Sequence, residues 1–190
     1  TIGFNVTVLT NARPISLDNA KEGDALIVTA PIGSGTILDA KMDGKARGDD
    51  LAAVLNHMSS PRGDIARALA RHAHAMTDVT GFGLAGHIAK IAKASNLSAD
   101  ISLSNLPLCE GAEDLAAKGT RSSIWADNRA AVDATLPDTP RSALLFDPQT
   151  AGGFVAAVPA DKVDAVRSEI PTAHHIGQLT AKGSVTLKAR

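Results

Sequence analysis

Short apolar runs recur along the chain and predict the strands of a sheet. Residues 25–28 (ALIV) and 154–158 (FVAAV) are apolar at every position, which is typical of buried strands. Residues 174–187 predict a hairpin that turns at Ala181-Lys182-Gly183. Strands are predicted at residues 4–9, 25–28, 99–103 and 154–158.

Apolar residues at helical spacing separate these strands. Residues 51–58 are apolar at positions 51, 54, 55 and 58, which predicts one face of a helix. Ser60 suits an N-cap and Pro61 a first helical position, so a new helix is expected to start there, with Asp64 in its first turn. Helices are predicted at residues 36–42, 51–58, 60–72, 84–92, 111–118, 128–135 and 161–170.

This alternation of strands and helices predicts a layered α+β domain over residues 1–190. Residues 11–24 contain Pro14, Asp18, Asn19 and Gly23 and are expected to form a loop. Some crossovers are too short to require parallel strands, so a mixed sheet is expected.

Composition and charge exclude several classes of protein. Of the 190 residues, 44% are hydrophobic and 21% charged, which is ordinary for a globular domain. The 19 Lys and Arg balance 20 Asp and Glu, whereas a nucleic-acid binder usually shows a basic excess. No apolar run is long enough to cross a bilayer, so no membrane partner is expected.

The N-terminal residues and the single cysteine indicate where the protein is located and whether the chain is whole. The N-terminus lacks the features of a signal peptide and the single cysteine, Cys109, excludes a disulfide framework, so a reduced cytoplasmic location is expected. The chain begins at Thr1 instead of Met, so it is expected to be processed or to be part of a longer protein.

Residues 75–87 (AMTDVTGFGLAGH) are the strongest candidate for chemistry. Asp78 lies just before two glycines, Gly81 and Gly83, where a helix begins. Free N–H groups at a helix start favour anions, glycine lets a phosphate approach the backbone, and a neighbouring carboxylate suits Mg²⁺. The alternative is that Asp78 and Thr80 only cap the helix, and spacing alone favours this alternative.

Residues 144–154 (LLFDPQTAGGF) form a second candidate loop between two apolar runs. Asp147-Pro148 suits the start of a turn, and Gly152-Gly153 permits unusual backbone angles. The loop could face a phosphate or the reacting centre, or it could be only a connection between elements, and the residues alone favour a connection.

The remaining reactive residues form no recognisable site. Cys109 has no histidine nearby in sequence, so an inert thiol is expected and not a nucleophile. The six histidines lack zinc-ligand spacing on a convincing helix. His87 could approach the anion site, but a solvent-facing or packing role is favoured. Trp125 is expected to be a core or rim anchor.

Four segments stand out together along the chain: TAPIGSG (29–35), AMTDVTGFGLAGH (75–87), GTRSSIWADNR (119–129) and LLFDPQTAGG (144–153). In this order and at these spacings they resemble one enzyme family, the selenide, water dikinases (selenophosphate synthetases), which belong to the AIR synthetase superfamily. The resemblance covers nearly the whole chain but only the C-terminal half of the family's sequence. It implies a three-layer α/β/α fold of the AIR synthetase C-terminal type.

The resemblance also implies an activity. In this family selenide, ATP and water give selenophosphate, AMP and phosphate, and Mg²⁺ is required. The nucleophilic Cys or selenocysteine and most of the nucleotide site belong to the N-terminal half, so the resemblance implies no catalytic residue here and no activity of this chain alone. Its implied partners are the N-terminal ATP-binding half of the same polypeptide and a second copy in a homodimer.

Roles are carried over residue by residue from the matching motifs. The resemblance implies that Asp78 binds metal. The resemblance places three residues near the nucleotide phosphates: Thr80, Gly81 and Gly83. Five residues form a candidate active-site loop: Asp147, Gln149, Thr150, Gly152 and Gly153.

The chain departs from the family pattern at one position and leaves alternatives open. Ala30 stands where the family often has Lys, so any role of that lysine in holding charge is missing. The variants GSGTILDAK and SSPRGDIARAL resemble copies fused behind an NADH-type oxidoreductase. The alternatives are another ATP-dependent enzyme of the superfamily, or a non-catalytic module that binds phosphate or a partner.

Overall fold

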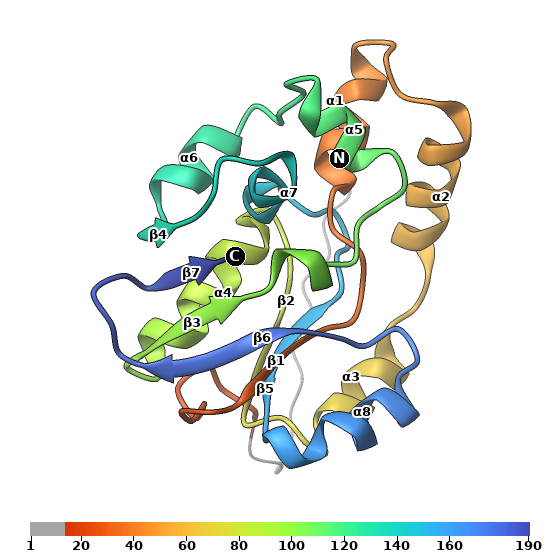
Figure 1. The fold of residues 1–190 in the computed structure, drawn as a ribbon. Coiled ribbons are helices and arrows are strands. Elements are labelled where there is room, and N and C mark those ends of the chain that lie inside the picture. The colour runs from red at the N-terminus through yellow and green to blue at the C-terminus, as the bar shows by residue number, and fades with distance from the viewer. Residues whose placement is uncertain (1–13) are drawn as a thin grey trace.

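A computed structural model describes residues 14–190 as a mixed seven-stranded sheet with helices on both faces (Figure 1). The strand predicted at residues 4–9 lies outside the described residues. Residues 14–24 form the expected loop. The strands are β1 (Ala25–Val28), β2 (Ala75–Asp78), β3 (Leu97–Ile101), β4 (Ala134–Thr135), β5 (Phe154–Val158), β6 (His174–Ala181) and β7 (Leu187–Ala189).

The sheet has the order β2-β5-β1-β6-β3-β7-β4. Strand β7 runs parallel to β3 and to β4, and the other neighbours are antiparallel. The predicted mixed sheet is therefore confirmed.

The apolar runs located β1 and β5 at their predicted bounds, but two other expectations were wrong. Strand β3 lies between β6 and β7, so the predicted hairpin at residues 174–187 does not form. A hairpin pattern in sequence cannot reveal that a third strand takes the pairing position. Strand β3 also ends at Ile101, and Leu103 begins a 3₁₀ turn.

Strand β2 was not predicted, because its sequence AMTD has no strong apolar pattern. Its four residues pair in antiparallel register with β5, from Ala75 opposite Ala157 to Asp78 opposite Phe154. The strand exists because the neighbouring β5 offers its hydrogen-bonding edge.

In the part of the chain from residue 14 onward, eight α-helices connect or cover the strands. They are α1 (Ser34–Met42), α2 (Gly48–Ser59), α3 (Gly63–Leu69), α4 (Gly83–Ala94), α5 (Ala112–Ala117), α6 (Trp125–Ala130), α7 (Pro140–Ala143) and α8 (Val163–Glu169). Three 3₁₀ turns lie at Leu103–Asn105, Leu144–Phe146 and Ala160–Lys162.

Two predicted helix starts were wrong. Ser60 ends α2, where its hydroxyl donates to the carbonyl of Asn56 at 2.9 Å, and α3 begins only at Gly63. Asp64 lies in the first turn of α3, as expected. The helix predicted at residues 128–135 instead begins at Trp125, ends at Ala130 and is followed by β4, which forms because β7 lies beside it.

Side chains of the central strands alternate between two separate apolar cores. In β1, Leu26 and Val28 pack in the core that contains α4, whereas Ile27 packs in the core of α3 and α8. Strand β5 alternates in the same way, with Ala157 on the first side and Ala156 on the second. The sheet is therefore buried on both faces, which gives the three-layer α/β/α arrangement.

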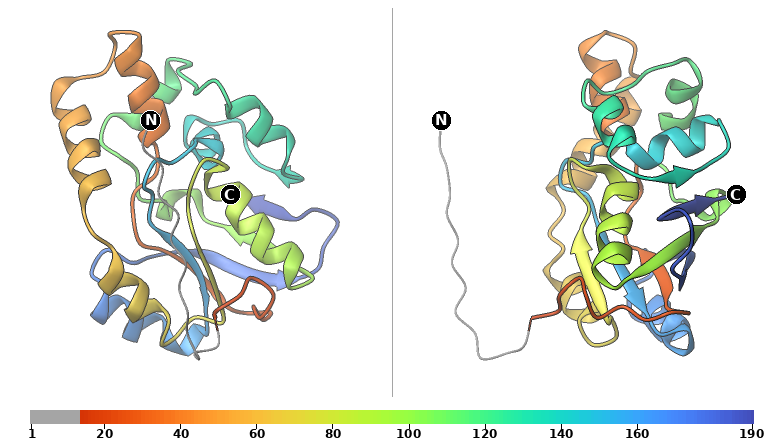
Figure 2. Two further views of the ribbon diagram at one scale, coloured as in Figure 1. Left: turned by 180° about the vertical axis from the view of Figure 1, so that it is seen from behind. Right: turned by 90° about the vertical axis from the view of Figure 1, so that its left-hand side faces the viewer.

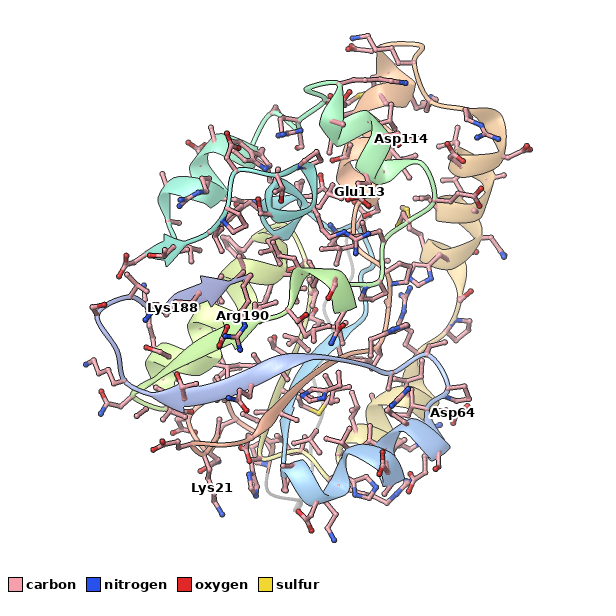
Figure 3. All side chains as sticks on the ribbon, in the orientation of Figure 1. Lys21, Asp64, Glu113, Asp114, Lys188 and Arg190 are labelled. Carbon is pink, nitrogen blue, oxygen red and sulfur yellow. The ribbon has the colours of Figure 1, made fainter. Side chains whose placement is uncertain are left out.

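Helices α1, α2, α5, α6 and α7 gather at one end of the sheet in both views of Figure 2, while α3 and α8 lie side by side near the other. Glu113 on α5, labelled in Figure 3, pairs with Arg141 on α7 at 2.7 Å. None of the helices within residues 14–190 combines the length and apolarity needed to cross a bilayer.

Candidate functional site

Three glycine-containing loops meet at one edge of the sheet. Strand β5 lies between β1 and β2 and is antiparallel to both, with Val155 opposite Val28 and Phe154 opposite Asp78. The start of β5 therefore lies beside the ends of β1 and β2. Residues 29–33, 79–82 and 147–153, which the sequence separates widely, form one cluster there.

The loop before β5 holds the start of α1 through two buried side chains. Asp147 accepts hydrogen bonds from the Gly35 N–H at 3.0 Å and the Thr36 hydroxyl at 2.7 Å. The Gln149 Oε1 accepts from the Ser34 N–H at 3.3 Å and the Ser34 hydroxyl at 3.0 Å. The Gln149 Nε2 donates to Asp147 Oδ2 at 2.9 Å. The polar side-chain atoms of Asp147 and Gln149 are therefore hydrogen-bonded to other protein groups.

The Asp147 carboxyl is almost fully buried beneath this network. Burial raises its pKa from 3.8 to about 6, against the hydrogen bonds from Thr36, Gln149 and Gly35, which favour the charged form. Asp147 is therefore a structural clamp at the helix start.

The two glycines of this loop allow close backbone packing. A Cβ at Gly152 would lie 2.2 Å from the Val79 carbonyl oxygen, and one at Gly153 would lie 2.4 Å from the Ala30 Cβ. Gly153 is buried, whereas Thr150 and Ala151 are exposed at the tip of the loop. Of the predicted loop residues, Thr150 is the one whose side chain faces outward.

Asp78 is exposed at the end of β2, beside this loop tip. Among residues 14–190, its carboxylate accepts a single side-chain hydrogen bond, from the neighbouring Thr77 hydroxyl at 3.2 Å. The backbone N–H groups of Gly81, Ala151 and Gly152 donate to no partner within residues 14–190. An accessible carboxylate and several free amides thus occupy the same sheet edge.

This donor set fits a magnesium ion only in part. Mg²⁺ takes one or two carboxylates and completes its shell with water and phosphate oxygens. Asp78 can supply one carboxylate, and no group of three His, Cys, Asp or Glu side chains occurs in the described part of the chain. The remaining ligands would have to come from a phosphate, from water or from residues outside residues 14–190.

His87 on α4 fixes the loop after β2, a role that the sequence did not predict. Its Nε2 accepts the Thr80 N–H at 3.0 Å, and the ring is buried instead of facing solvent. Burial lowers the pKa of His87, as does the charge of Lys90, while Asp78 acts in the opposite direction. A neutral imidazole therefore accepts from Thr80, whose N–H is consequently not free for a ligand.

The start of α4 is covered by the backbone of the segment before Asp147. Gly83 has a φ of +71°, and a Cβ there would lie 2.8 Å from the Leu145 carbonyl oxygen. Gly83 is therefore buried, while Gly81 has open space around its Cα. Of the two glycines, Gly81 is the accessible one.

Asn128 on α6 ties two of these segments together, and sequence reasoning missed it. Its Nδ2 donates to the Gly81 carbonyl at 2.8 Å and to the Phe146 carbonyl at 3.0 Å. Its place in GTRSSIWADNR was the available signal. Trp125 in the same segment is a half-buried anchor, as expected, and its Nε1 donates to the Ala143 carbonyl at 2.8 Å.

Two further features carry no reaction chemistry. Burial, together with the charge of Asp147, raises the pKa of the Cys109 thiol to about 12, so this thiol is inert, as expected.

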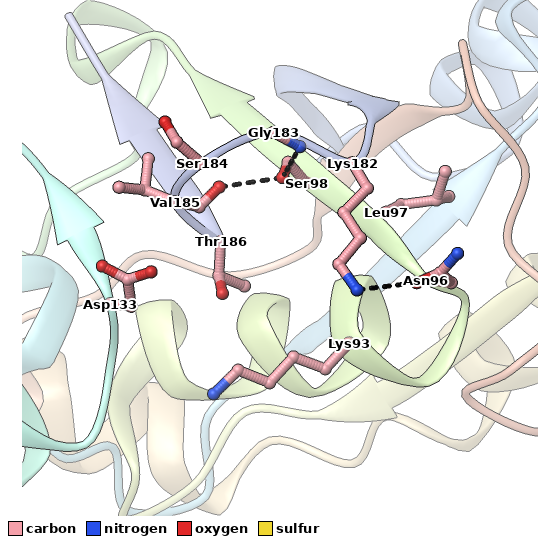
Figure 4. A pocket seen from close by; sticks show the side chains of 10 residues that line it. All are labelled: Lys93, Asn96, Leu97, Ser98, Asp133, Lys182, Gly183, Ser184, Val185 and Thr186. Atoms are coloured by element: carbon pink, nitrogen blue, oxygen red, sulfur yellow. Dashed lines mark hydrogen bonds between the residues drawn. The ribbon is translucent and has the colours of Figure 1, made fainter.

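A pocket of about 200 Å³ lies beside the end of α4. Figure 4 shows its lining, where Lys182 Nζ donates to Asn96 at 3.0 Å. No sequence-predicted site residue lines it.

Comparison with known proteins decides the family. Residues 21–190 match the family described as "AIR synthase related protein, C-terminal domain". This chain belongs to that family. Among relatives of the domain, selenide, water dikinase of Bdellovibrio bacteriovorus is 32% identical over 93% of this chain and 54% of that protein. The enzyme of the same name from Shewanella sp. strain MR-4 is 35% identical over 84% of this chain and 46% of its own length.

A solved structure shares the fold of the domain at lower identity. Thiamine-monophosphate kinase from Stenotrophomonas maltophilia K279a has a TM-score of 0.68 and 19% identity, covering 92% of this chain and 52% of that one. The chain spans about half the length of the curated relatives that it matches. What these comparisons show of this chain is the AIR synthase related C-terminal domain.

Proposed function

We propose that this domain belongs to a selenide, water dikinase and contributes one wall of its phosphate site. The observation that carries the proposal is the identity of 32% and 35% to enzymes of that name over most of this chain. The likeness to thiamine-monophosphate kinase, at 19% identity, supports only the fold. The reaction would convert selenide, ATP and water into selenophosphate, AMP and phosphate.

Within this site, Asp78 is the residue that would hold Mg²⁺. Its exposed carboxylate and the free amides of Gly81, Ala151 and Gly152 support this role, because a metal bridges a carboxylate to phosphate and amides favour anions. When bound, Mg²⁺ would neutralise charge on the transferring phosphates. The chain's own contribution is to hold these groups at a rigid sheet edge.

The other predicted site residues fall into two groups, accessible residues and buried residues that support the loop. Gly81 and Thr150 would approach a phosphate in this proposal, which their exposure supports, since Thr150 is exposed and Gly81 partly so. Asp147, Gln149 and Gly153 would act from behind, by holding the loop against β2 and α1, whereas Gly152 would both pack against Val79 and offer its free amide. We assign Gly83 and the Thr80 backbone the same supporting role.

The rest of the active site is proposed to come from an N-terminal half of the same polypeptide. Phosphoryl transfer needs several positioned metals and cations, and the described residues offer one exposed carboxylate at this edge. The lysine that the family often has is replaced by Ala30, which is buried against Gly153, so another cation would take its place. We further propose that the full-length enzyme forms a homodimer and works in the cytoplasm.

The test is Asp78→Asn in the full-length protein that carries this domain. We expect Mg²⁺-dependent, selenide-dependent formation of AMP from ATP to fall roughly 100-fold, the order of loss caused by misplaced reacting groups. Higher Mg²⁺ should recover part of the activity. Asp64→Asn on α3 is the matched control, because Asp64 is also an exposed aspartate (Figure 3).

Near-normal turnover in Asp78→Asn would overturn the metal role. Full-length protein that binds Mg-ADP but forms no AMP with selenide would instead favour a non-catalytic phosphate-binding module. Transfer of the ATP γ-phosphate with release of ADP alone would indicate another kinase of the superfamily.

A further inference from the structure

A second cavity, outside the glycine-loop cluster, lies between α6, α7 and residues 136–138. It has a volume of about 250 Å³. Two arginines, two aromatic residues and a proline contribute to its walls, together with one carboxylate. The residues that matter here are Arg121, Trp125, Arg129, Pro137, Asp138 and Phe146.

The two arginines and the tryptophan follow a spacing of four residues. Arg121, Trp125 and Arg129 therefore lie along one side of α6 and the turn before it. The Arg121 guanidinium carbon lies 5.3 Å from the centre of the Trp125 ring. The Arg129 guanidinium carbon lies 5.0 Å from the centre of the Phe146 ring.

Backbone carbonyls hold both guanidinium groups but use only part of each. Arg121 Nη1 donates to the Ala116 carbonyl at 2.8 Å and the Thr120 carbonyl at 2.7 Å. Arg129 Nη1 donates to the Val132 carbonyl at 3.3 Å. The Nε and Nη2 donors of both arginines have no partner among the described residues.

Neither arginine has a carboxylate partner within residues 14–190, although Asp138 lines the same cavity. The lining therefore carries two positive charges and one negative charge. A guanidinium with free N–H groups presents a fork of donors that matches phosphate or carboxylate oxygens. The half-buried Trp125 ring and the exposed Pro137 offer apolar surface beside it, whereas the Phe146 ring is almost fully buried.

We propose that this cavity binds a small organic oxyanion, with its phosphate or carboxylate on the arginines and its apolar part on Trp125. The volume is below the range of about 300–1,000 Å³ for drug-sized ligands, so the ligand is small. This site is independent of the proposed dikinase activity.

The chain's single tryptophan makes a direct test possible. The indole N–H resonance of Trp125 is followed by NMR while phenyl phosphate, benzoate or neutral benzyl alcohol is added. We expect saturable shifts with at least one of the two anions and much weaker binding of the alcohol. A response to phenyl phosphate alone identifies a phosphate site, and a response to benzoate alone identifies a carboxylate site.

Arg129→Gln is the main variant, because Arg129 makes one long backbone bond among the described residues, so we expect the variant to fold. Affinity for the anion should fall roughly 10-fold, as expected for lost hydrogen bonds to a charged group. Arg129→Lys keeps the positive charge but loses the forked donors, so its anion affinity should lie between those of the wild type and Arg129→Gln. Arg67→Gln, an exposed arginine on α3, should bind as the wild type does.

Two results would overturn the proposal. One is no saturable shift with either anion. The other is the same anion affinity in Arg129→Gln as in the wild type, with circular dichroism showing that the variant is folded.

Discussion

A single amide side chain, that of Asn128, joins the loop after β2 to the segment that precedes Asp147. Its two donated hydrogen bonds reach the carbonyls of Gly81 and Phe146. His87 and Gln149 act similarly, since each side chain pairs with loop backbone. Individual polar residues therefore fix the shape of the candidate site without facing it.

Asp147 should make the stability of the protein depend on pH. Its pKa is about 6 in the folded protein against 3.8 ordinarily, so between these values the folded state keeps a proton that the unfolded chain has released. The free energy of unfolding should therefore fall as pH rises through this window, by up to about 3 kcal/mol. Urea unfolding across the window measures this fall.

Comparison with Asp147→Asn isolates the contribution of this carboxyl, because other groups titrate in the same window. The variant should lack this part of the pH dependence, whereas Asp161→Asn, an exposed aspartate, should retain it. Equal pH dependence in wild type and Asp147→Asn would contradict the raised pKa of Asp147.

At the scale of elements, the start of α4 depends on one glycine. Gly83 has a positive φ, and a Cβ there would lie 2.8 Å from the Leu145 carbonyl oxygen in the 3₁₀ turn at Leu144–Phe146. An added methyl group would meet backbone atoms on that turn, which cannot move aside like a flexible side chain. The contact sets the distance between α4 and the Asp147 loop.

Gly83→Ala should therefore destabilise the protein by about 2 kcal/mol or more, from backbone strain and overpacking together. Chemical denaturation measures the change. Gly48→Ala is the control, because Gly48 begins α2 with open space around it and should be neutral or slightly stabilising. A Gly83→Ala protein as stable as Gly48→Ala would show that the two segments separate easily.

At the scale of the whole molecule, the sheet separates two apolar cores. Consecutive residues of β1 point into different ones, since Leu26 packs with α4 and Ile27 with α3 and α8. Both side chains are fully buried. A sheet with one solvated face would bury only alternate residues.

Leu26→Ala and Ile27→Ala should each destabilise the protein by about 3 kcal/mol, because each leaves a cavity in a packed core. Their unfolding free energies are compared with that of Leu55→Ala, which truncates an exposed side chain on α2 and should change little. A small effect for either core variant would contradict the three-layer packing.

The local sequence determined those elements that have a continuous apolar run or a regular apolar spacing. Strands β1 and β5 are apolar at every position, and α4 has regular apolar spacing, so their positions followed from residue pattern alone. The inert character of Cys109 and the anchoring role of Trp125 also followed from residue type and context. Such features depend on neighbours within a few positions in the chain.

Tertiary structure alone decided the features that depend on distant partners. Strand β2 forms because β5 pairs with it, and the predicted terminal hairpin fails because β3 takes the place between β6 and β7. Pairing energy between segments far apart in sequence leaves no local pattern. For the same reason, the sequence could not show which candidate site residues are exposed. Asp78 and Thr150 are exposed, whereas Asp147 accepts hydrogen bonds from Gly35 and Thr36, more than a hundred positions away.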